Sequence, residues 1–379
     1  MKFETFVMED TLEAIIDYRG KTPKKSDTGI PTLSAKSVKN NSIDYSSCYF
    51  ISEEEYNRFM VRGFPKKGDI LLTTEAPLGM VARLDRDNVA IAQRLLTLRG
   101  KDGILDNNYL LYFLQSPTGQ HLLKSHETGT TVTGIKQAVF KKLEIALPEI
   151  KIQKKIASIL SSIDDKISLN TEINENLLQQ AQALFKERFL SHDALPLGWK
   201  QMTLGDVSEM SAGGDKPKTI SNQKTEKCQY PVYSNSISNE GLYGFTTDYK
   251  IPAESVTVSA RGTIGFVCLR HIPYTPIVRL VTLVPRANII SAKYLYLWLK
   301  SIPIHGTGTT QQQLTVPDFR KTEIIVPTEA EMRRFTETIN PLFQQMWSNQ
   351  DESAKLADVR DTLLPRLMSG ELDVSNIDL

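Results

Sequence analysis

The feature that most constrains the fold is an internal repeat at an offset of 179 residues. The string Thr-Gly-Thr-Thr at 128–131 recurs at 307–310, and positions 128–148 share nine identities in 21 with positions 307–327. Background composition would give roughly one or two. Upstream the matches continue with small shifts, as loop insertions produce: Thr11-Leu12 with Thr203-Leu204, Pro31 and Ser34 with Pro231 and Ser234, Gly79 with Gly265, Arg94-Leu95 with Arg279-Leu280, and Tyr109-Leu110 with Tyr294-Leu295. The chain therefore reads as globule, helix, globule, helix.

Both globules combine strand and helix patterns. Asp69–Thr74 and Ser255–Ser259 are β-branched and apolar, which predicts buried strands. Tyr109–Gln115 and Tyr294–Lys300 are apolar segments that we interpret as short helices. Each globule is thus expected to be a mixed α/β domain.

A long helix is predicted over 149–190, a stretch of 42 residues without glycine or proline. A heptad pattern places Ile156, Ile163, Asn170, Leu177 and Leu184 at a, and Ile152, Ile159, Lys166, Ile173 and Gln180 at d. These mostly apolar positions indicate a coiled-coil seam. At about 1.5 Å per residue the helix would be roughly 63 Å long.

The matching second helix follows Pro327 and places Asn349 where the first has Asn170. A buried polar a residue costs stability but fixes register, so both asparagines are candidates for register control. The alternative is that each is simply solvated at a loose crossing. Pro341 lies inside the second helix and is expected to kink or restart it, at a cost of roughly 3 kcal/mol.

Composition and charge exclude several classes of protein. No stretch is apolar enough to span a membrane, the N-terminus does not resemble a secretory signal, and three scattered cysteines without a CxxC pair disfavour disulfides and structural zinc. We therefore expect a cytoplasmic protein. Residues 1–148 carry 20 Lys and Arg against 18 Asp and Glu, residues 191–327 carry 14 against 10, and residues 328–379 carry 5 against 10. Such weak basicity fits a protein that binds nucleic acid with a partner's help.

The sequence carries no recognisable catalytic motif. There is no GxxxxGK[ST] loop, no GxGxxG after a strand, and no metal-ligand spacing among the five histidines. Asn340–Phe343 faintly resembles the Asn-Pro-Pro-aromatic loop of amino-methyltransferases, but it lacks the second proline and sits in a helical pattern. Gly213–Lys216 lacks the surrounding template, and we interpret it as a loop turn that could lie near phosphate. We expect no catalytic residue, no metal and no cofactor.

Several strings resemble the specificity subunit of type I restriction-modification systems, and the resemblance covers nearly the whole chain. The most specific is Leu195–Trp199 followed by Thr203–Val207, which is similar to the sequence motif at the start of a target recognition domain in that family. The other strings are Thr11–Ile15, Tyr18–Pro23, the glycine-threonine segments before each helix, Ile152–Ile156 and Leu363–Gly370. The chain departs from the family's pattern in two places. The first half lacks the Gly-Trp motif, and the second helix contains Pro341.

The resemblance implies an α+β fold with a pseudo-two-fold repeat, in which two target recognition domains are separated by two long antiparallel coiled-coil helices. The expected domains are recognition domains at 1–148 and 191–327, a spacer helix at 149–190, and a second helix with a C-terminal tail at 328–379. Each domain would read half of a split, asymmetric site in double-stranded DNA. The helices would set the spacer and dock two adenine-modifying methyltransferase subunits, which restriction-translocase subunits would join.

Residues expected to touch DNA come from loops, because arginine and amide side chains read base edges while lysine and small polar groups hold phosphates. They are Arg19, Lys21, Lys24, Lys25, Ser34, Lys36, Lys39, Asn40 and Lys136 in the first half, and Lys216, Lys218, Ser234, Asn235, Asn239, Arg261, Gln311, Gln312 and Gln313 in the second. Solvated turns explain many of these equally well. Arg261-Gly262 matches Glu75-Ala76, a charge reversal that two readers of different sequences would show, although Arg261 can also form a structural salt bridge.

Two other functions remain as alternatives to a non-catalytic specificity subunit. One is a DNA-modifying enzyme with an unrecognised active site, which would methylate DNA as a purified chain. The other is a coiled-coil adaptor that binds only proteins, which would leave no DNA footprint in the assembled complex.

Overall fold

A computed structural model describes residues 1–18, 20–129, 133–252, 254–306 and 312–377. The chain forms two compact units. Unit 1 comprises Met1–Asn170 and Asp351–Leu379, and unit 2 comprises Thr171–Gln350. Each unit therefore combines one globule with parts of both long helices.

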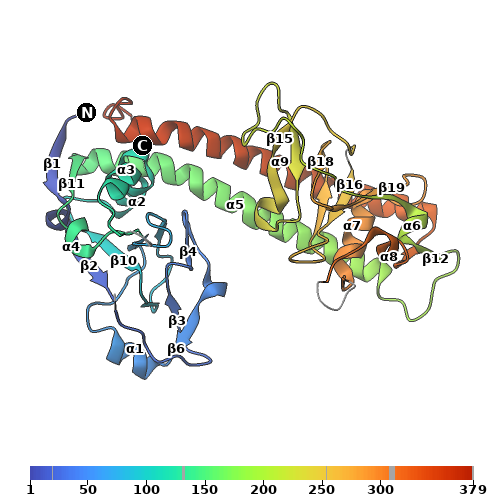
Figure 1. Ribbon diagram of the computed structural model, residues 1–379, viewed down its shortest axis with the longest axis horizontal. Helices are drawn as coiled ribbons and strands as arrows, with labels where there is room; N and C mark the ends of the chain where they lie inside the picture. Colours follow the sequence, from blue (N-terminus) through green and yellow to red (C-terminus); the bar gives the residue numbers. More distant parts are fainter. Residues whose placement is uncertain (19, 130–132, 253, 307–311, 378–379) are drawn as a thin grey trace. The chain divides into compact units, whose positions relative to one another are not determined.

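Unit 1 holds the first globule, whose elements appear in blue to green in Figure 1. They are β1 (Phe3–Val7), η1 (Met8–Thr11), β2 (Leu12–Asp17), β3 (Ile30–Leu33), β4 (Val38–Lys39), β5 (Ser42–Ile43), η2 (Tyr45–Ser47), β6 (Tyr49–Ile51), α1 (Glu53–Phe59), β7 (Ile70–Thr73), β8 (Val81–Arg83), β9 (Ala90–Ile91), β10 (Leu95–Gly100), α2 (Asn107–Gln115), α3 (Pro117–Ser125), α4 (Gln137–Phe140) and β11 (Glu144–Pro148).

Unit 2 holds the second globule. Its elements are β12 (Lys200–Thr203), α6 (Leu204–Val207), β13 (Ser208–Ala212), β14 (Tyr230–Tyr233), η3 (Ser238–Gly241), β15 (Leu242–Thr246), β16 (Ser255–Val258), β17 (Val267–Arg270), β18 (Thr275–Pro276), β19 (Val281–Pro285), α7 (Ala292–Ser301), α8 (Val316–Phe319) and β20 (Glu323–Val326).

Three sheets of each unit have the same topology, which confirms the predicted duplication, whereas the β4-β5 hairpin of unit 1 has no counterpart among the described residues of unit 2. A four-stranded sheet has the order β2-β10-β7-β8 in unit 1 and β13-β19-β16-β17 in unit 2. The three-stranded sheets β6-β3-β9 and β15-β14-β18 also correspond, each with one antiparallel and one parallel pairing. The pairs β1-β11 and β12-β20 complete the match.

The predicted strands and short helices form where the local sequence favours them. All four residues of β7 and of β16 are buried, because each strand lies inside its sheet and is covered on both faces. The Asp106 side chain caps α2 by accepting from the Tyr109 amide, and the Ser291 side chain caps α7 in the same way at Tyr294. The matched Tyr-Leu pairs of the repeat thus begin equivalent buried helices.

The two long helices are α5 (Ile150–Phe189) and α9 (Glu329–Met368), each of 40 residues. The expectation that Pro341 would restart the second helix is wrong, because α9 continues as one helix across it. Its neighbours Ile339 and Phe343 are fully buried in the core of unit 2. Each such side chain stabilises the fold by roughly 1.5 to 3 kcal/mol, which offsets the proline penalty. Among the described helices, none has an apolar stretch suited to crossing a membrane.

In each unit the two helices pair in antiparallel fashion (Figure 1). In unit 1, Asp164 contacts Arg360 and Asn170 contacts Glu352. In unit 2, Asn174 contacts Asn349, and the rings of Phe185 and Phe335 lie 5.9 Å apart. Residue numbers rise on one helix as they fall on the other, so the predicted antiparallel arrangement is confirmed.

The predicted heptad positions hold only in the first part of α5. Ile156 is buried, but Ile173 and Leu184 are 36% and 38% exposed, while Ala181, Phe185 and others between the predicted positions are buried. An α-helix drifts relative to a 3.5-residue repeat. In unit 2, moreover, α5 faces the second globule as well as α9, so its apolar face follows the globule.

Both central asparagines are buried and hydrogen bonded to the opposite helix. In unit 1, Asn170 Nδ2 donates to the Glu352 carboxylate (2.8 Å) and to the Ser353 hydroxyl (3.2 Å). In unit 2, Asn349 Nδ2 donates to Asn174 Oδ1 (2.9 Å). Such bonds are lost when one helix slides along the other, so register control by Asn170 and Asn349 remains our prediction.

Each globule shares a hydrophobic core with both helices. In unit 1 this core joins Leu110 and Phe113 of α2 to Ile156 of α5 and to Leu364 and Leu367 of α9. In unit 2 an aromatic core joins Tyr294 of α7 to Phe185 and Phe189 of α5 and to Phe335 and Phe343 of α9. Unit 1 also has a second core, which includes Tyr18, Leu33 and Ile51 and contains no residue of either long helix.

Asp164 of α5 connects three parts of unit 1. Its carboxylate accepts from Asn41 Nδ2 in the β4-β5 turn (2.8 Å) and from the Tyr112 hydroxyl of α2 (2.7 Å), and it pairs with Arg360 of α9 (2.8 Å). Burial, and then the hydrogen bond to Asp164, raises the pKa of Tyr112, so this hydroxyl remains a donor at neutral pH.

We predict that Asp164→Ala lowers the free energy of unfolding by about 2 to 4 kcal/mol, because three donors lose their acceptor at a largely buried position. Urea denaturation followed by circular dichroism measures the change. The exposed neighbour Asp165→Ala serves as the control and should change stability by less than about 0.5 kcal/mol. Equal losses in the two variants would contradict the assigned role of Asp164.

Candidate nucleic-acid interface

Four loops meet at one edge of unit 1, which we call loop edge 1 (residues 20–25, 74–79, 92–94 and 133–136). Gln93 Nε2 donates to the Thr22 hydroxyl (2.9 Å), and Arg94 pairs with Glu75 (2.7 Å). Glu75 forms a backbone bridge with Gly134. These contacts connect segments that lie far apart in the sequence into one polar surface.

Unit 2 has an equivalent surface, loop edge 2 (residues 213–218, 234–236, 260–265, 277–280 and 312–315). The Arg279 amide donates to the Gly213 carbonyl (2.8 Å), and the Leu314 amide donates to the Ala260 carbonyl (3.0 Å). The Arg261 guanidinium donates to Gln313 Oε1 (3.1 Å). Loops that correspond in the repeat therefore come together in both units.

Some of the residues predicted to bind DNA in the first half lie on loop edge 1. Lys21, Lys24, Lys25 and Lys136 are exposed there. The Lys25 ammonium lies 4.7 Å from the centre of the Tyr49 ring. Arg19 lies outside the described residues.

The other predicted residues of the first half lie beside the β4-β5 hairpin. Lys39 Nζ donates to the Lys36 carbonyl (2.8 Å), and Asn40 is exposed in the hairpin turn. The Ser34 amide donates to the Ser37 hydroxyl (3.2 Å). The turn itself contacts α5 through Asn41, whereas Ser34 follows β3, whose Leu33 carbonyl accepts from the Ala92 amide of loop edge 1 (2.7 Å).

In the second half, Arg261, Gln312 and Gln313 lie on loop edge 2 with Lys216 and Lys218, and all five are exposed. The Lys216 ammonium lies 4.3 Å from the centre of the Tyr243 ring. Gln311 lies outside the described residues.

Three predicted residues of the second half have structural contacts. Asn235 Nδ2 donates to the Val278 carbonyl (2.5 Å), and its Oδ1 accepts from the Ala260 amide (2.7 Å). Both ends of this amide thus join neighbouring loops of edge 2. The Ser234 hydroxyl donates to the Gly241 carbonyl (3.3 Å), and Asn239 lines a separate cavity.

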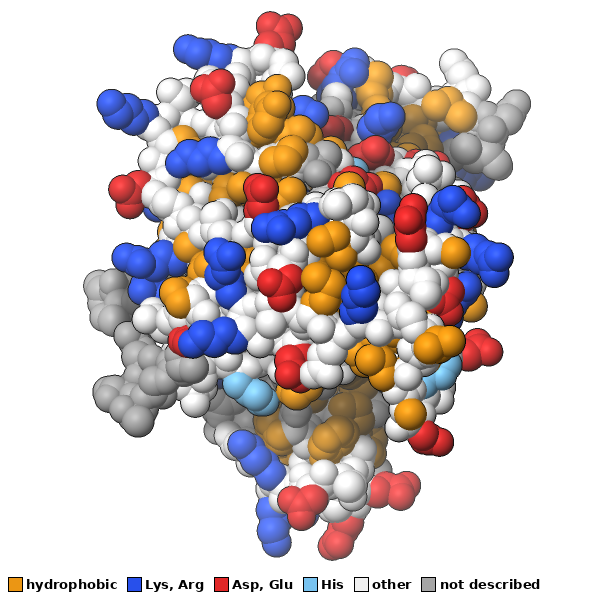
Figure 2. Space-filling model, turned by 90° about the vertical axis from the view of Figure 1, so that its right-hand side faces the viewer, with side chains coloured by type: hydrophobic (Ala, Val, Ile, Leu, Met, Phe, Trp, Pro, Cys, Tyr) orange, Lys and Arg blue, Asp and Glu red, His pale blue; other side chains and the backbone are white. Residues whose placement is uncertain are grey.

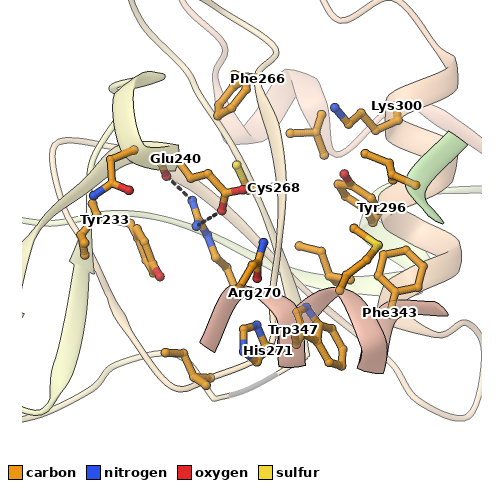
Figure 3. Close-up of a pocket in the computed structure, with 18 residues that line it drawn as sticks. Tyr233, Glu240, Phe266, Cys268, Arg270, His271, Tyr296, Lys300, Phe343 and Trp347 are labelled. Carbon is orange, nitrogen blue, oxygen red and sulfur yellow. Dashed lines mark hydrogen bonds and ion pairs between the residues drawn. The ribbon is translucent and has the colours of Figure 1, made fainter. Parts of the chain in front are cut away.

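That cavity, of about 560 Å³, lies in unit 2 between β17, α7 and the long helices (Figure 3). Arg270 lies within it, stacked 3.6 Å from the centre of the Tyr233 ring and hydrogen bonded to Thr257 and to the Glu240 carbonyl. Burial raises the pKa of Cys268 to about 11, so its thiol stays protonated at neutral pH. The polar groups of the cavity thus hold η3 against β17, and Cys268 is not an activated nucleophile.

The described residues also give no support to a catalytic centre. Asn340–Phe343 lies within α9, with Phe343 buried, rather than in a loop that would hold a base. No group of three or more His, Cys, Asp or Glu among the described residues is placed to hold a metal ion. Figure 2 shows lysine and arginine side chains interspersed with acidic ones on the face it displays, in keeping with the small net charge.

Two site candidates escaped the sequence analysis, Arg94 on loop edge 1 and Arg279 on loop edge 2. Their backbone φ angles are 69° and 60°, in the left-handed region that arginine rarely adopts. A residue held there costs on the order of 1 to 3 kcal/mol, and such strain concentrates at functional sites. The internal repeat already aligns these two arginines, but only their backbone angles mark them as site candidates.

Comparison with known proteins finds one family model matching twice. It describes the "Type I restriction modification DNA specificity domain" and matches residues 2–179 and 196–356. A type I restriction enzyme specificity subunit of Methanocaldococcus jannaschii, MjaIX, is 28% identical over 387 residues, covering 92% of this chain and 88% of the relative. A putative type I specificity subunit of Mycoplasma pneumoniae is 25% identical over 351 residues, covering 90% of each chain.

The fold is also similar to that of a solved structure. The crystal structure of the type I restriction-modification S subunit from M. genitalium matches with a TM-score of 0.59. The alignment covers 97% of this chain and 96% of that one at 20% sequence identity. This likeness supports the duplicated fold.

We predict that Asn235→Ala destabilises the chain by about 1 to 3 kcal/mol, because the Ala260 amide and the Val278 carbonyl both lose their partner. Chemical denaturation measures the loss. The exposed Asn222→Ala is the matched control and should be nearly neutral. If Asn235→Ala keeps full stability, its two hydrogen bonds do not join the loops of edge 2.

Proposed function

The chain belongs to the family of type I restriction-modification DNA specificity proteins, and from this premise we propose that it recognises a bipartite, asymmetric site in double-stranded DNA, with one recognition domain for each half-site. As a specificity subunit it is a non-catalytic DNA-recognition component with two recognition domains. The observation that carries the proposal is the pair of equivalent loop edges with different side chains. A duplicated frame with unlike surfaces suits two different half-sites.

In this proposal the recognition domains are residues 1–148 and 191–327, and the helical segments are residues 149–190 and 328–379. The paired helices set the length of the unspecified spacer between the half-sites. Their antiparallel contacts within each unit, including those of Asn170 and Asn349, support a fixed register.

The proposed DNA contacts divide by chemistry. Lys21 and Lys136 on loop edge 1, and Lys216 and Lys218 on loop edge 2, suit phosphates because an exposed ammonium is a flexible point charge. Arg261, Gln312 and Gln313 suit base edges because their donors and acceptors have defined directions. Asn235 acts indirectly by holding the backbone before Arg261.

The long helices are the proposed docking surface for two methyltransferase subunits, which restriction-translocase subunits then join. Large apolar side chains are exposed on them, namely Leu169 and Val359 in unit 1 and Ile173 and Leu184 in unit 2. Exposed apolar groups on helices that also support a core favour a protein partner. We propose that the complex works in the cytoplasm, where its three free thiols are stable.

The test is to replace residues 1–148 with the corresponding region of a relative and to map methylated sites made by the assembled complex. Because α2 shares its core with the helices, the chimera should keep Leu110 and Phe113 of this chain. We expect one half-site to change and the other to stay the same. The unaltered chain with the same partners is the control. Change in both half-sites, or in neither, would reject one domain per half-site.

A further inference from the structure

Arg94 and Arg279 occupy the same place in the two halves, immediately before β10 and close before β19. Both have left-handed backbone angles, which glycine adopts without a steric penalty and arginine does not. Val278, next to Arg279, is also left-handed, with a φ of 53°. A turn of this shape needs no arginine, so the fold alone does not account for this residue type in both copies.

The surrounding loops hold both backbones in place. The Thr74 amide donates to the Arg94 carbonyl (3.0 Å), and the Arg279 amide donates to the Gly213 carbonyl (2.8 Å). The side chains remain accessible, since both residues are exposed. Each arginine side chain is therefore exposed to solvent, while its backbone is held in place on its loop edge.

The two arginines differ in what surrounds their side chains. Arg94 Nε pairs with Glu75 at 2.7 Å, an arrangement that orients the guanidinium and leaves other N–H groups available. The position matching Glu75 is Arg261 in the second half. Among the described residues, the Arg279 side chain has no hydrogen-bond or ion-pair partner. Loop edge 1 thus presents a charge pair and loop edge 2 two arginines.

We propose that Arg94 and Arg279 are equivalent specificity-determining residues, each reading one base pair of its own half-site. This inference rests on the proposed function. A phosphate contact needs only a flexible positive charge, whereas a base contact uses the directed, planar donors of a guanidinium, and the held backbone fixes where each of these two side chains begins. The preferred partner is guanine, whose O6 and N7 accept two parallel hydrogen bonds from arginine in the major groove. Glu75 is then a positioning residue for Arg94.

Glycine substitutions test the proposal without straining the fold. Arg94→Gly and Arg279→Gly remove the side chain and suit the left-handed backbone, so both variants should fold at least as stably as the parent chain. Methylation-site mapping with the assembled complex should show roughly 10- to 100-fold weaker discrimination at one base pair. Arg94→Gly should affect the first half-site only and Arg279→Gly the second only, so each variant is the control for the other.

Two further variants separate reading from general attraction to DNA. Arg94→Lys keeps the positive charge but not the bidentate geometry of the guanidinium. It should therefore lose the base preference just as Arg94→Gly does. Glu75→Gln should weaken discrimination at the same base pair as Arg94→Gly. Unchanged preferences in both glycine variants, or weaker binding that is uniform across sequences, would overturn the proposal. If the parent complex itself methylates no bipartite site, the proposed function fails instead.

Discussion

The structure depends on the burial of apolar faces that each globule shares with both long helices. In unit 2 the rings of Phe189 and Phe335, from α5 and α9, lie 4.8 Å apart, and both pack beside Tyr294 of the globule. Fully burying one such side chain stabilises the fold by roughly 1.5 to 3 kcal/mol, so losing one helix removes a large part of the core. The compact unit therefore differs from the unit of sequence repetition. Each globule needs the helix that follows it and a stretch of the other helix.

Within this common frame the two copies have diverged where side chains meet. Asp164 of α5 corresponds to Phe343 of α9 at the offset of 179 residues. Asp164 gathers three polar donors in unit 1, whereas Phe343 packs with Tyr296 and Trp347 in unit 2. Ionic and aromatic contacts thus fill equivalent positions. The loop edges diverge in the same way, with Glu75 opposite Arg261. A frame that tolerates such exchange allows the side chains of one recognition domain to change without altering the fold.

The sequence predicts the duplicated fold and the long helices well, because repeats and unbroken helical stretches are local patterns. It misplaces the exposed Ile173 and Leu184 because the apolar face of α5 follows two neighbours, which a single heptad pattern does not represent. It overstates the effect of Pro341 on the second helix. The proline penalty can be read from the local sequence, whereas the burial of Phe343 that offsets it depends on tertiary contacts. At the site, residue type indicates which loops are polar, but Asn235 and Arg261 are both plausible readers until their contacts are known. Arg94 and Arg279 become candidates only through their backbone angles.

In the proposed function, the paired helices fix the distance between the two half-sites. One added base pair moves the half-sites apart by about 3.4 Å and rotates one against the other by roughly a tenth of a turn. The most direct measurement is methylation, by the assembled complex, of synthetic duplexes that keep both half-sites and differ only in spacer length. The account predicts methylation at one spacer length and a steep loss when a single base pair is added or removed. Equal methylation over several spacer lengths would contradict it.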